Sequence, residues 1–280
     1  MEDKAIVLSN PLFADLSKIG HKPEEDIYVW SMGLGLHNFH LQDALRKNIT
    51  DSTMRRSIYR DLWKHFHSME LESINSVLGV TADPDVDAIN ATLDKLMTDQ
   101  EHPAIFGAGD YVEEAILNWV KGFAAYDWCA WTYLEKWLGA KDALGIYMGL
   151  WEAFSLGELE HWKEVVGITD EANVTMDQLG ELSRVYWESI GCPYKVTEHS
   201  ETIHEAELED CPYWQNMKQL FGEDKARSMT LKTEAHVSVN YYDAVLKAMG
   251  VFDKYSFTMD RFLCCGDGCC RVRFELRKPL

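Results

Sequence analysis

Residues 256–277, SFTMDRFLCCGDGCCRVRFELR, decide the interpretation of the fold, because two strand-like runs flank a turn rich in glycine and cysteine. In the second run, Val272, Phe274 and Leu276 alternate with charged side chains. A period of two is typical of a strand with one buried face. The stretch therefore predicts a terminal β-hairpin whose tip carries four of the seven cysteines of the chain.

A second alternating run lies further upstream, in residues 202–209. His204, Ala206 and Leu208 face one way and the glutamates between them face the other. Residues 194–199 are the expected hairpin partner of this run. If residues 202–209 and 271–277 are neighbouring strands, the outward arginines of the last strand would complement these outward glutamates.

The rest of the chain has helical periodicity and clear helix-ending signals such as Gly79, Gly139 and Gly167. The predicted helices span residues 24–47, 52–78, 83–97, 111–138, 141–166, 175–190, 212–221 and 224–249. The fourth and fifth are joined tightly, so we expect them to pack as an antiparallel pair. Together these patterns predict an α+β protein, with a helical domain over residues 1–170 packed on a ββααββ antiparallel sheet domain over residues 171–280.

Charge and composition exclude some functions. The 280 residues carry a formal charge of -19, which argues against nucleic acid as a partner because phosphate binding needs clustered Lys and Arg. The charged start lacks the pattern of a signal peptide, and no apolar run has the length of a membrane span. We therefore expect a cytoplasmic protein with reduced cysteines, a small-molecule substrate and no membrane partner. The aromatic helical part also suits a homodimer surface.

The cysteines of the hairpin tip are the first candidate site. Strand parity predicts that Cys265 and Cys270 point inward, and that Cys264 and Cys269 point outward or lie in the turn. Such a cluster can supply a thiolate nucleophile, hold a zinc ion or form a redox pair. The alternative is that these small residues only fill space under the hairpin.

A row of polar residues on the preceding helix is the second candidate. His236, Asn240 and Asp243 are spaced four and three apart and share one face. A cysteine opposite this row would have a base and an orienting acid beside it. Cys211 begins the helix at residues 212–221, where a helix N-terminus favours a thiolate, and we expect it near the same region. The alternative is that the row is a solvated helix face.

Histidines with ligand-like spacing also occur on the predicted helices, as in His37-x-x-His40. A di-iron bundle needs two Glu-x-x-His helices, and residues 158–161 supply one. The other occurrence, residues 201–204, falls on a predicted strand. We therefore expect residues 158–164 to be a solvated helix face.

The C-terminal third resembles the L-2-amino-thiazoline-4-carboxylic acid hydrolase family over residues 175–280. The resemblance is carried by the Cys-Pro-Tyr at residues 211–213, by the long helix with Asp243, and by the Gly-Asp-Gly-Cys-Cys-Arg-Val-Arg-Phe at residues 266–274. It implies hydrolytic opening of a C–N bond in a small cyclic, amidine- or thiazoline-like, carboxylated substrate. Cys270 would be the nucleophile or a metal ligand, His236 the base and Asp243 the orienting acid, with Cys211 and Asn240 nearby.

The same ending is similar to vinyl-reductase-type small-ligand domains. That resemblance implies a binding or sensor module in which zinc is held by the cysteines of the turn, namely Cys264, Cys265, Cys269 and Cys270. In either case we expect the pocket between the C-terminal sheet and the aromatic helices, where Trp and Tyr side chains can sandwich a small ring. A purely structural protein with cysteine-rich packing is the third alternative.

Overall fold

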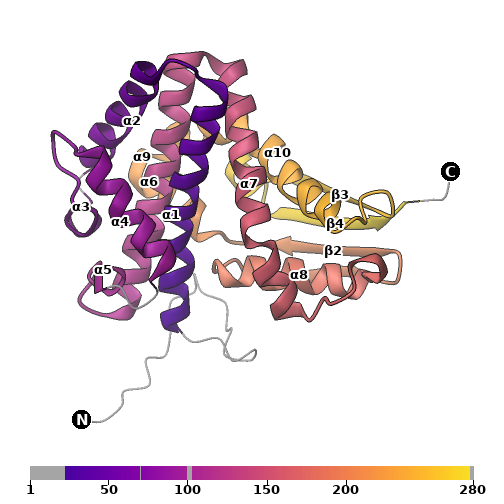
Figure 1. Cartoon of the computed structure of the whole chain (residues 1–280). Helices are drawn as coiled ribbons and strands as arrows, with labels where there is room; N and C mark the ends of the chain where they lie inside the picture. The colour runs from indigo at the N-terminus through magenta and orange to yellow at the C-terminus, as the bar shows by residue number, and fades with distance from the viewer. Residues whose placement is uncertain (1–22, 70, 100–102, 278–280) are drawn as a thin grey trace, which may run out of the picture.

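The computed structural model describes residues 23–69, 71–99 and 103–277. The described part of the chain begins with seven helices, which together form the predicted helical part (Figure 1). They are α1 (Pro23–Asn48), α2 (Ser52–His67), α3 (Glu72–Leu78), α4 (Val86–Thr98), α5 (Pro103–Phe106), α6 (Val112–Leu138) and α7 (Ala140–Val166). The predicted antiparallel pair is present as α6 and α7, which are joined at Gly139 in a backbone conformation with φ of 80°.

The single helix predicted over residues 52–78 is wrong, because two helices occupy this stretch. The last turn of α2 closes when the backbone N–H of Ser68 bonds the carbonyl of Lys64 at 3.2 Å. The chain changes direction between α2 and α3, and Ile74 of α3 then packs on α6 at Gly122. A Cβ atom at Gly122 would lie 3.2 Å from the Ile74 side chain, so a glycine there allows the close approach.

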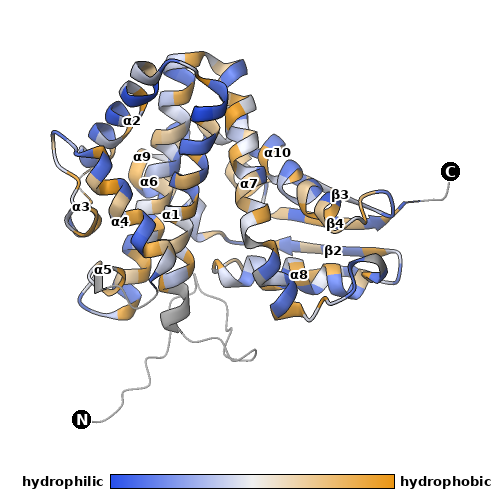
Figure 2. Cartoon of the chain, in the orientation of Figure 1, coloured by the Kyte–Doolittle hydropathy of each residue, from blue (hydrophilic) through white to orange (hydrophobic). Residues whose placement is uncertain are grey.

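Helix α6 forms the centre of the helical part. Every residue from 122 to 131 is buried, and α1, α2, α7 and α9 (Pro212–Phe221) all contact this helix. In the outer helices hydrophilic and hydrophobic residues are mixed along the chain, as expected for helices with one buried face (Figure 2). No helix among the described residues is both long enough and apolar enough to cross a membrane.

The C-terminal part has the predicted ββααββ order, and the fold class is α+β. After the short 3₁₀ turn η2 (Glu171–Asn173), the elements are α8 (Met176–Ser189), β1 (Tyr194–His199), β2 (Ile203–Leu208), α9, α10 (Glu223–Ala248), β3 (Tyr255–Arg261), the 3₁₀ turn η3 (Leu263–Cys265) and β4 (Cys270–Leu276). The four strands form one antiparallel sheet in the order β1-β2-β4-β3. Helices α9 and α10 return to the helical part, α9 against α6 and α10 against α7.

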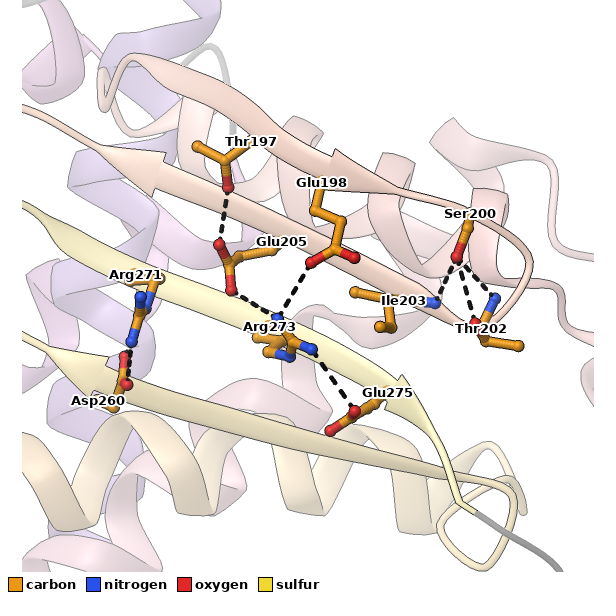
Figure 3. Close-up of polar contacts among 10 residues, drawn as sticks. All are labelled: Thr197, Glu198, Ser200, Thr202, Ile203, Glu205, Asp260, Arg271, Arg273 and Glu275. Carbon is orange, nitrogen blue, oxygen red and sulfur yellow. Dashed lines mark hydrogen bonds and ion pairs between the residues drawn. The ribbon is translucent and has the colours of Figure 1, made fainter.

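The predicted pairing of glutamates with arginines across the sheet is confirmed. Strand β2 is the neighbour of β4, with Glu205 opposite Arg273 and Glu207 opposite Arg271. The Arg273 guanidinium lies 2.8 Å from the Glu205 carboxylate and also reaches Glu198 (Figure 3). Because this face of the sheet is largely exposed, each pair contributes little to stability, on the order of 0–1 kcal/mol.

The inner face of the sheet is covered by α8 and α10. Phe274 is fully buried, and the ring of Tyr242 from α10 stacks on Phe257 with centroids 4.1 Å apart. Helix α8 crosses β2 at Gly180, where a Cβ atom would lie 2.5 Å from Nδ1 of His204. Glycine is therefore required for this helix to lie so close to the strand.

A chain of hydrogen bonds ties α8 to the first two strands. Nε2 of His199 lies 2.9 Å from the Asp177 carboxylate, and the Nδ1 atoms of His199 and His204 are 2.9 Å apart. The hydroxyl of Tyr194 lies 2.8 Å from Nε2 of His204. Burial, and then the neighbouring His199, lower the pKa of His204 to about 4.

This lowered pKa predicts a loss of stability in mild acid. The unfolded chain takes a proton on His204 below about pH 6.5, whereas the folded protein does so only near pH 4. The stabilisation that neutral His204 contributes to the folded protein is thus fully present above about pH 6.5 and is lost as the pH falls toward 4. One pKa unit corresponds to about 1.4 kcal/mol, and after allowance for solvent screening we expect a loss of about 2 kcal/mol.

Urea unfolding at several pH values checks this prediction. We expect the stability difference between wild type and His204→Asn to shrink by about 2 kcal/mol between pH 7 and pH 4. The control His236→Asn removes an exposed histidine and should follow the wild-type pH dependence. A stability difference for His204→Asn that stays constant over this range would contradict the prediction.

Candidate functional site

A cavity of about 130 Å³ lies where the two parts of the chain meet. Residues of α1, α6, α7, α8, α9 and α10 line it, and no residue of a strand is among them. The predicted pocket is thus found beside the aromatic helices, but its other wall is α8 and α10 rather than the sheet itself. Aromatic side chains form most of the wall, including Trp30, Phe123, Trp151, Phe154, Tyr186 and Trp187. An apolar cavity of roughly 150 Å³ can hold one benzene molecule, so the size suits a single ring.

Asp127 of α6 forms the polar centre of this region. Its side chain is almost completely buried and it lines the cavity. The carboxylate accepts hydrogen bonds from Nε2 of His37 at 2.9 Å, from the hydroxyl of Tyr147 at 2.6 Å and from the hydroxyl of Tyr213. These donors come from α1, α7 and α9, so one carboxylate ties four helices together.

The two tyrosine donors to Asp127 are held in their protonated forms. Burial, and then the charge of Asp127, raise the pKa values of Tyr147 and Tyr213 well above their usual range. Because a carboxylate only accepts hydrogen bonds, the proton of His37 must sit on Nε2. The imidazole is also packed edge-on against the rings of Phe123 and Trp151, with centroids 5.5 and 5.2 Å away.

Asp127 was not among the predicted site residues, although the sequence around it indicates a buried acidic side chain. In residues 122–131, GFAAYDWCAW, Asp127 is the single charged side chain of a stretch that is otherwise apolar or aromatic. Aspartate is almost never fully buried without partners. An acidic residue at this position of a buried helix therefore indicates a hydrogen-bonded network.

Helix α10 supplies the other polar groups of the cavity. Thr230, Thr233, Glu234 and Ser238 line the cavity from this helix. Glu234 accepts a hydrogen bond from the hydroxyl of Ser238, one turn along the helix. Burial raises the pKa of the Glu234 carboxyl, and the charge of Asp127 raises this pKa further.

The structure brings two of the predicted cysteines close to this cavity. Cys211, the residue before α9, is half-buried and lines the cavity. Cys270, the first residue of β4, is buried as predicted, and its Sγ accepts a hydrogen bond from the backbone N–H of Leu263 at 3.3 Å. Burial, and then the neighbouring Cys211, raise the pKa of the Cys270 thiol.

The polar row of α10 lies apart from the cavity lining. His236 is exposed, and the amide of Asn240 is 3.4 Å from both the Met148 carbonyl and the Glu152 carboxylate. Asp243 is half-buried, and this burial raises the pKa of its carboxyl. None of the three lines the cavity, whereas Thr233, Glu234 and Ser238 on another face of the same helix do. The catalytic roles that the resemblance implies for the row stay predictions.

Cys264 lies in a turn, which is one of the two positions predicted for it, and Cys265 packs partly buried against the core. Cys264 is buried with 7% exposure, whereas Cys265 is half-buried. Strand β3 ends at Arg261 and the cysteines follow in the 3₁₀ turn η3, so the alternation of a strand does not apply to them. Cys269, which was predicted to point outward or lie in the turn, is also buried.

The two thiols of Cys264 and Cys265 differ in their ease of ionisation. The contact between Cys264 and Cys265 raises the pKa of the Cys264 thiol and lowers that of Cys265. Of these two, Cys265 is the one favoured as a thiolate. Within residues 23–69, 71–99 and 103–277, no three or more His, Cys, Asp or Glu side chains are grouped as metal ligands. Zinc binding by these cysteines stays a prediction.

Two further predictions about histidines have different outcomes. His37 is not a metal ligand in the described arrangement but the hydrogen-bond donor to Asp127. The side chains at positions 158 and 161 lie outside the described residues. The solvated face expected at residues 158–164 of α7 therefore stays a prediction.

Comparisons with known proteins add little to this geometry. No family model and no curated protein matches the sequence. Among solved structures, the chain is similar to the phenol-responsive sensory domain of the transcription activator PoxR, solved with phenol. The match has 17% identity and a TM-score of 0.35, and it covers 55% of this chain and 73% of that domain. A TM-score of this size establishes neither a shared fold nor a shared ligand.

Proposed function

We propose that this protein is a small-ligand-binding or sensor module, and that its ligand is a single-ring organic molecule held in the cavity. The observation that carries the proposal is the cavity itself, about 130 Å³ in volume and walled by aromatic side chains around the buried Asp127 network. Ligand sites are typically apolar concave spaces with a few fixed polar groups. The hydrogen bonds to Asp127 hold the walls in place before any ligand arrives, which reduces the ordering that binding must cause.

The position of the cavity suits a sensor. Its lining residues come from α1, α6 and α7 on one side and from α8, α9 and α10 on the other. A ligand would contact both groups of helices at once and would stabilise their packed arrangement by mass action. Binding could in this way be transmitted to surfaces on the C-terminal part.

The hydrolase prediction has less support from the geometry. A thiolate is the reactive form of a cysteine nucleophile, and burial raises the pKa of the Cys270 thiol. His236, the expected base, is exposed on α10 and is not part of the cavity lining. The homodimer suggested by the aromatic helices stays a prediction.

Filling the cavity tests the proposed function. Gly33 of α1 lines the cavity, and a Cβ atom there would make an ordinary contact with Phe123 at 3.7 Å. Leucine at this position is also a better helix former than glycine. We expect Gly33→Leu to fold normally and to weaken binding of single-ring ligands at least tenfold, because its side chain occupies the space of the ring.

Isothermal titration with toluene, phenol, benzyl alcohol and benzylamine is the measurement. The control is Gly149→Leu, which adds the same side chain on α7 at an exposed position with no atom within 4 Å of its Cβ. This variant should bind as wild type does. Unchanged affinity in Gly33→Leu, or no binding of any of these compounds to wild type, would refute the proposal.

A further inference from the structure

Five hydroxyl groups that line the cavity already donate their protons to the protein. The hydroxyls of Tyr147 and Tyr213 donate to Asp127, and the hydroxyl of Thr233 donates to the carbonyl of Met229 at 3.2 Å. A hydroxyl has one proton but two lone pairs. What these groups can still offer to a ligand is therefore an acceptor, not a donor.

Two more lining residues follow the same pattern. The hydroxyl of Thr230 donates to the carbonyl of Cys264 at 3.0 Å, and that of Ser238 donates to Glu234. The indole N–H groups of Trp30, Trp151 and Trp187 are buried without a hydrogen-bond acceptor. The five hydroxyls, in contrast, can offer a ligand only acceptors.

The charges of the lining have one sign. Asp127 and Glu234 are acidic, and no Lys, Arg or His is among the described residues that line the cavity. Asp127 already has three donors, whereas Glu234 has the Ser238 hydroxyl. In the part of the chain that the structure describes, no basic side chain forms an ion pair with Glu234. A carboxylate in an apolar setting is costly without a cationic partner, and its raised pKa reflects that cost.

The aromatic walls of the cavity provide the second feature of a cation site, beside the carboxylates. Aromatic faces attract an organic cation by about 0.5–2 kcal/mol each, and cages of such rings are a known way of holding ammonium groups. Tyr147, Trp151 and Tyr213 stand on the Asp127 side of the cavity, and Tyr241 and Tyr242 stand on α10 with Glu234. An ammonium group has three donors and no acceptor, so it matches the acceptors, the rings and the free carboxylate together.

We infer that the ligand is a small organic cation, an amine attached to a single ring, whose ammonium group is the partner of Glu234. This inference rests on the proposed function and narrows it to one ligand class. It also argues against a carboxylated ligand, which the resemblance to the hydrolase family implied, because a carboxylate would meet two acids and no basic side chain among the described lining residues.

Matched compounds of nearly equal size test the inference on wild-type protein. Benzylamine, benzyl alcohol, toluene and benzoate differ in one substituent, which is cationic, a neutral donor, apolar or anionic. By isothermal titration at pH 7 we expect benzylamine to bind at least tenfold more tightly than benzyl alcohol, and benzoate to bind most weakly. Benzyl alcohol or toluene binding as tightly as benzylamine, or benzoate binding best, would overturn the inference while leaving the proposed function intact.

The variant Glu234→Gln asks whether the carboxylate carries the preference. Glutamine keeps the shape and the acceptor for Ser238 but removes the charge. We expect benzylamine to lose its advantage over benzyl alcohol, with benzyl alcohol affinity changed less than threefold. The control Glu201→Gln removes an exposed carboxylate from the turn between β1 and β2 and should keep the wild-type ratio.

Each outcome has one meaning. A tenfold preference for benzylamine that persists in folded Glu234→Gln contradicts the assignment of Glu234 as the partner. If Glu234→Gln does not fold, the wild-type ratio of benzylamine to benzyl alcohol still decides between a cationic and a neutral ligand. If none of the four compounds binds to wild type, both the inference and the proposed function fail.

Discussion

Replacing Asp127 by alanine should lower the free energy of unfolding by about 3–5 kcal/mol. The substitution removes the acceptor of three buried donors, Nε2 of His37 and the hydroxyls of Tyr147 and Tyr213. Each donor would then be buried without a partner, and the four helices that meet at the carboxylate would lose their common contact. Urea unfolding followed by circular dichroism measures the effect.

Matched variants separate this network from a general effect of losing a charge. Asp83→Ala removes an exposed carboxylate that pairs with Arg60, and we expect a change within about 1 kcal/mol. Tyr213→Phe removes a single donor and should cost about 1 kcal/mol. If Asp127 acts through these donors, Asp127→Ala should cost less in the Tyr213→Phe background than alone. Equal costs in both backgrounds, or a loss below 1 kcal/mol for Asp127→Ala, would contradict this account.

The second large effect is expected at Phe274 in the middle of β4. The side chain is fully buried, and its ring lies 5.1 Å from that of Phe257 and 5.5 Å from that of Tyr242. Truncating a buried phenylalanine to alanine typically costs about 3–5 kcal/mol, since it removes apolar contacts and leaves a cavity. Phe274→Ala should therefore weaken the packing of α10 on the sheet, and the urea midpoint should fall accordingly.

The neighbouring residue gives the control for this prediction. Arg273 directly precedes Phe274 in β4 and points to the outer face of the sheet, where it pairs with Glu205 and Glu198 (Figure 3). Because both pairs keep some contact with solvent, with the Arg273 side chain 28% exposed, Arg273→Ala should cost about 1 kcal/mol or less. A loss for Arg273→Ala that equals the loss for Phe274→Ala would show that the outer ion pairs, and not the inner face, hold the sheet.

The pH dependence of stability at His204 and the ligand affinities of the cavity variants test two different parts of the protein. His204 and Gly180 lie where α8 contacts β2, so the pH series reports on this contact. Gly33→Leu and Glu234→Gln report on opposite walls of the cavity. Because the two sites use different residues, a loss of ligand binding with normal pH-dependent stability would place the ligand at the cavity.

The class of fold and most of the elements could be predicted from the sequence alone. Alternation in residues 202–209 and 271–277, helical periodicity elsewhere and glycines at helix ends were sufficient for the α+β class and the ββααββ order. The pairing of Glu205 with Arg273 was also predictable, because charges of opposite sign on outward positions favour neighbouring strands. All of these signals are local, or they relate two short patterns to each other.

The tertiary structure alone decided the site. The sequence pointed to Cys270 and to the row at His236 because short spacings are visible in a linear chain, yet the cavity gathers Asp127, Tyr147, Tyr213 and Glu234 from separate helices. No spacing in the sequence relates α6, α7, α9 and α10, since their approach depends on how whole helix faces pack. Strand parity could not show that Cys264 is buried, because the chain leaves the strand for a 3₁₀ turn before the cysteines are reached. Local chemistry fixes the secondary structure, whereas contacts between distant segments fix where a ligand can bind.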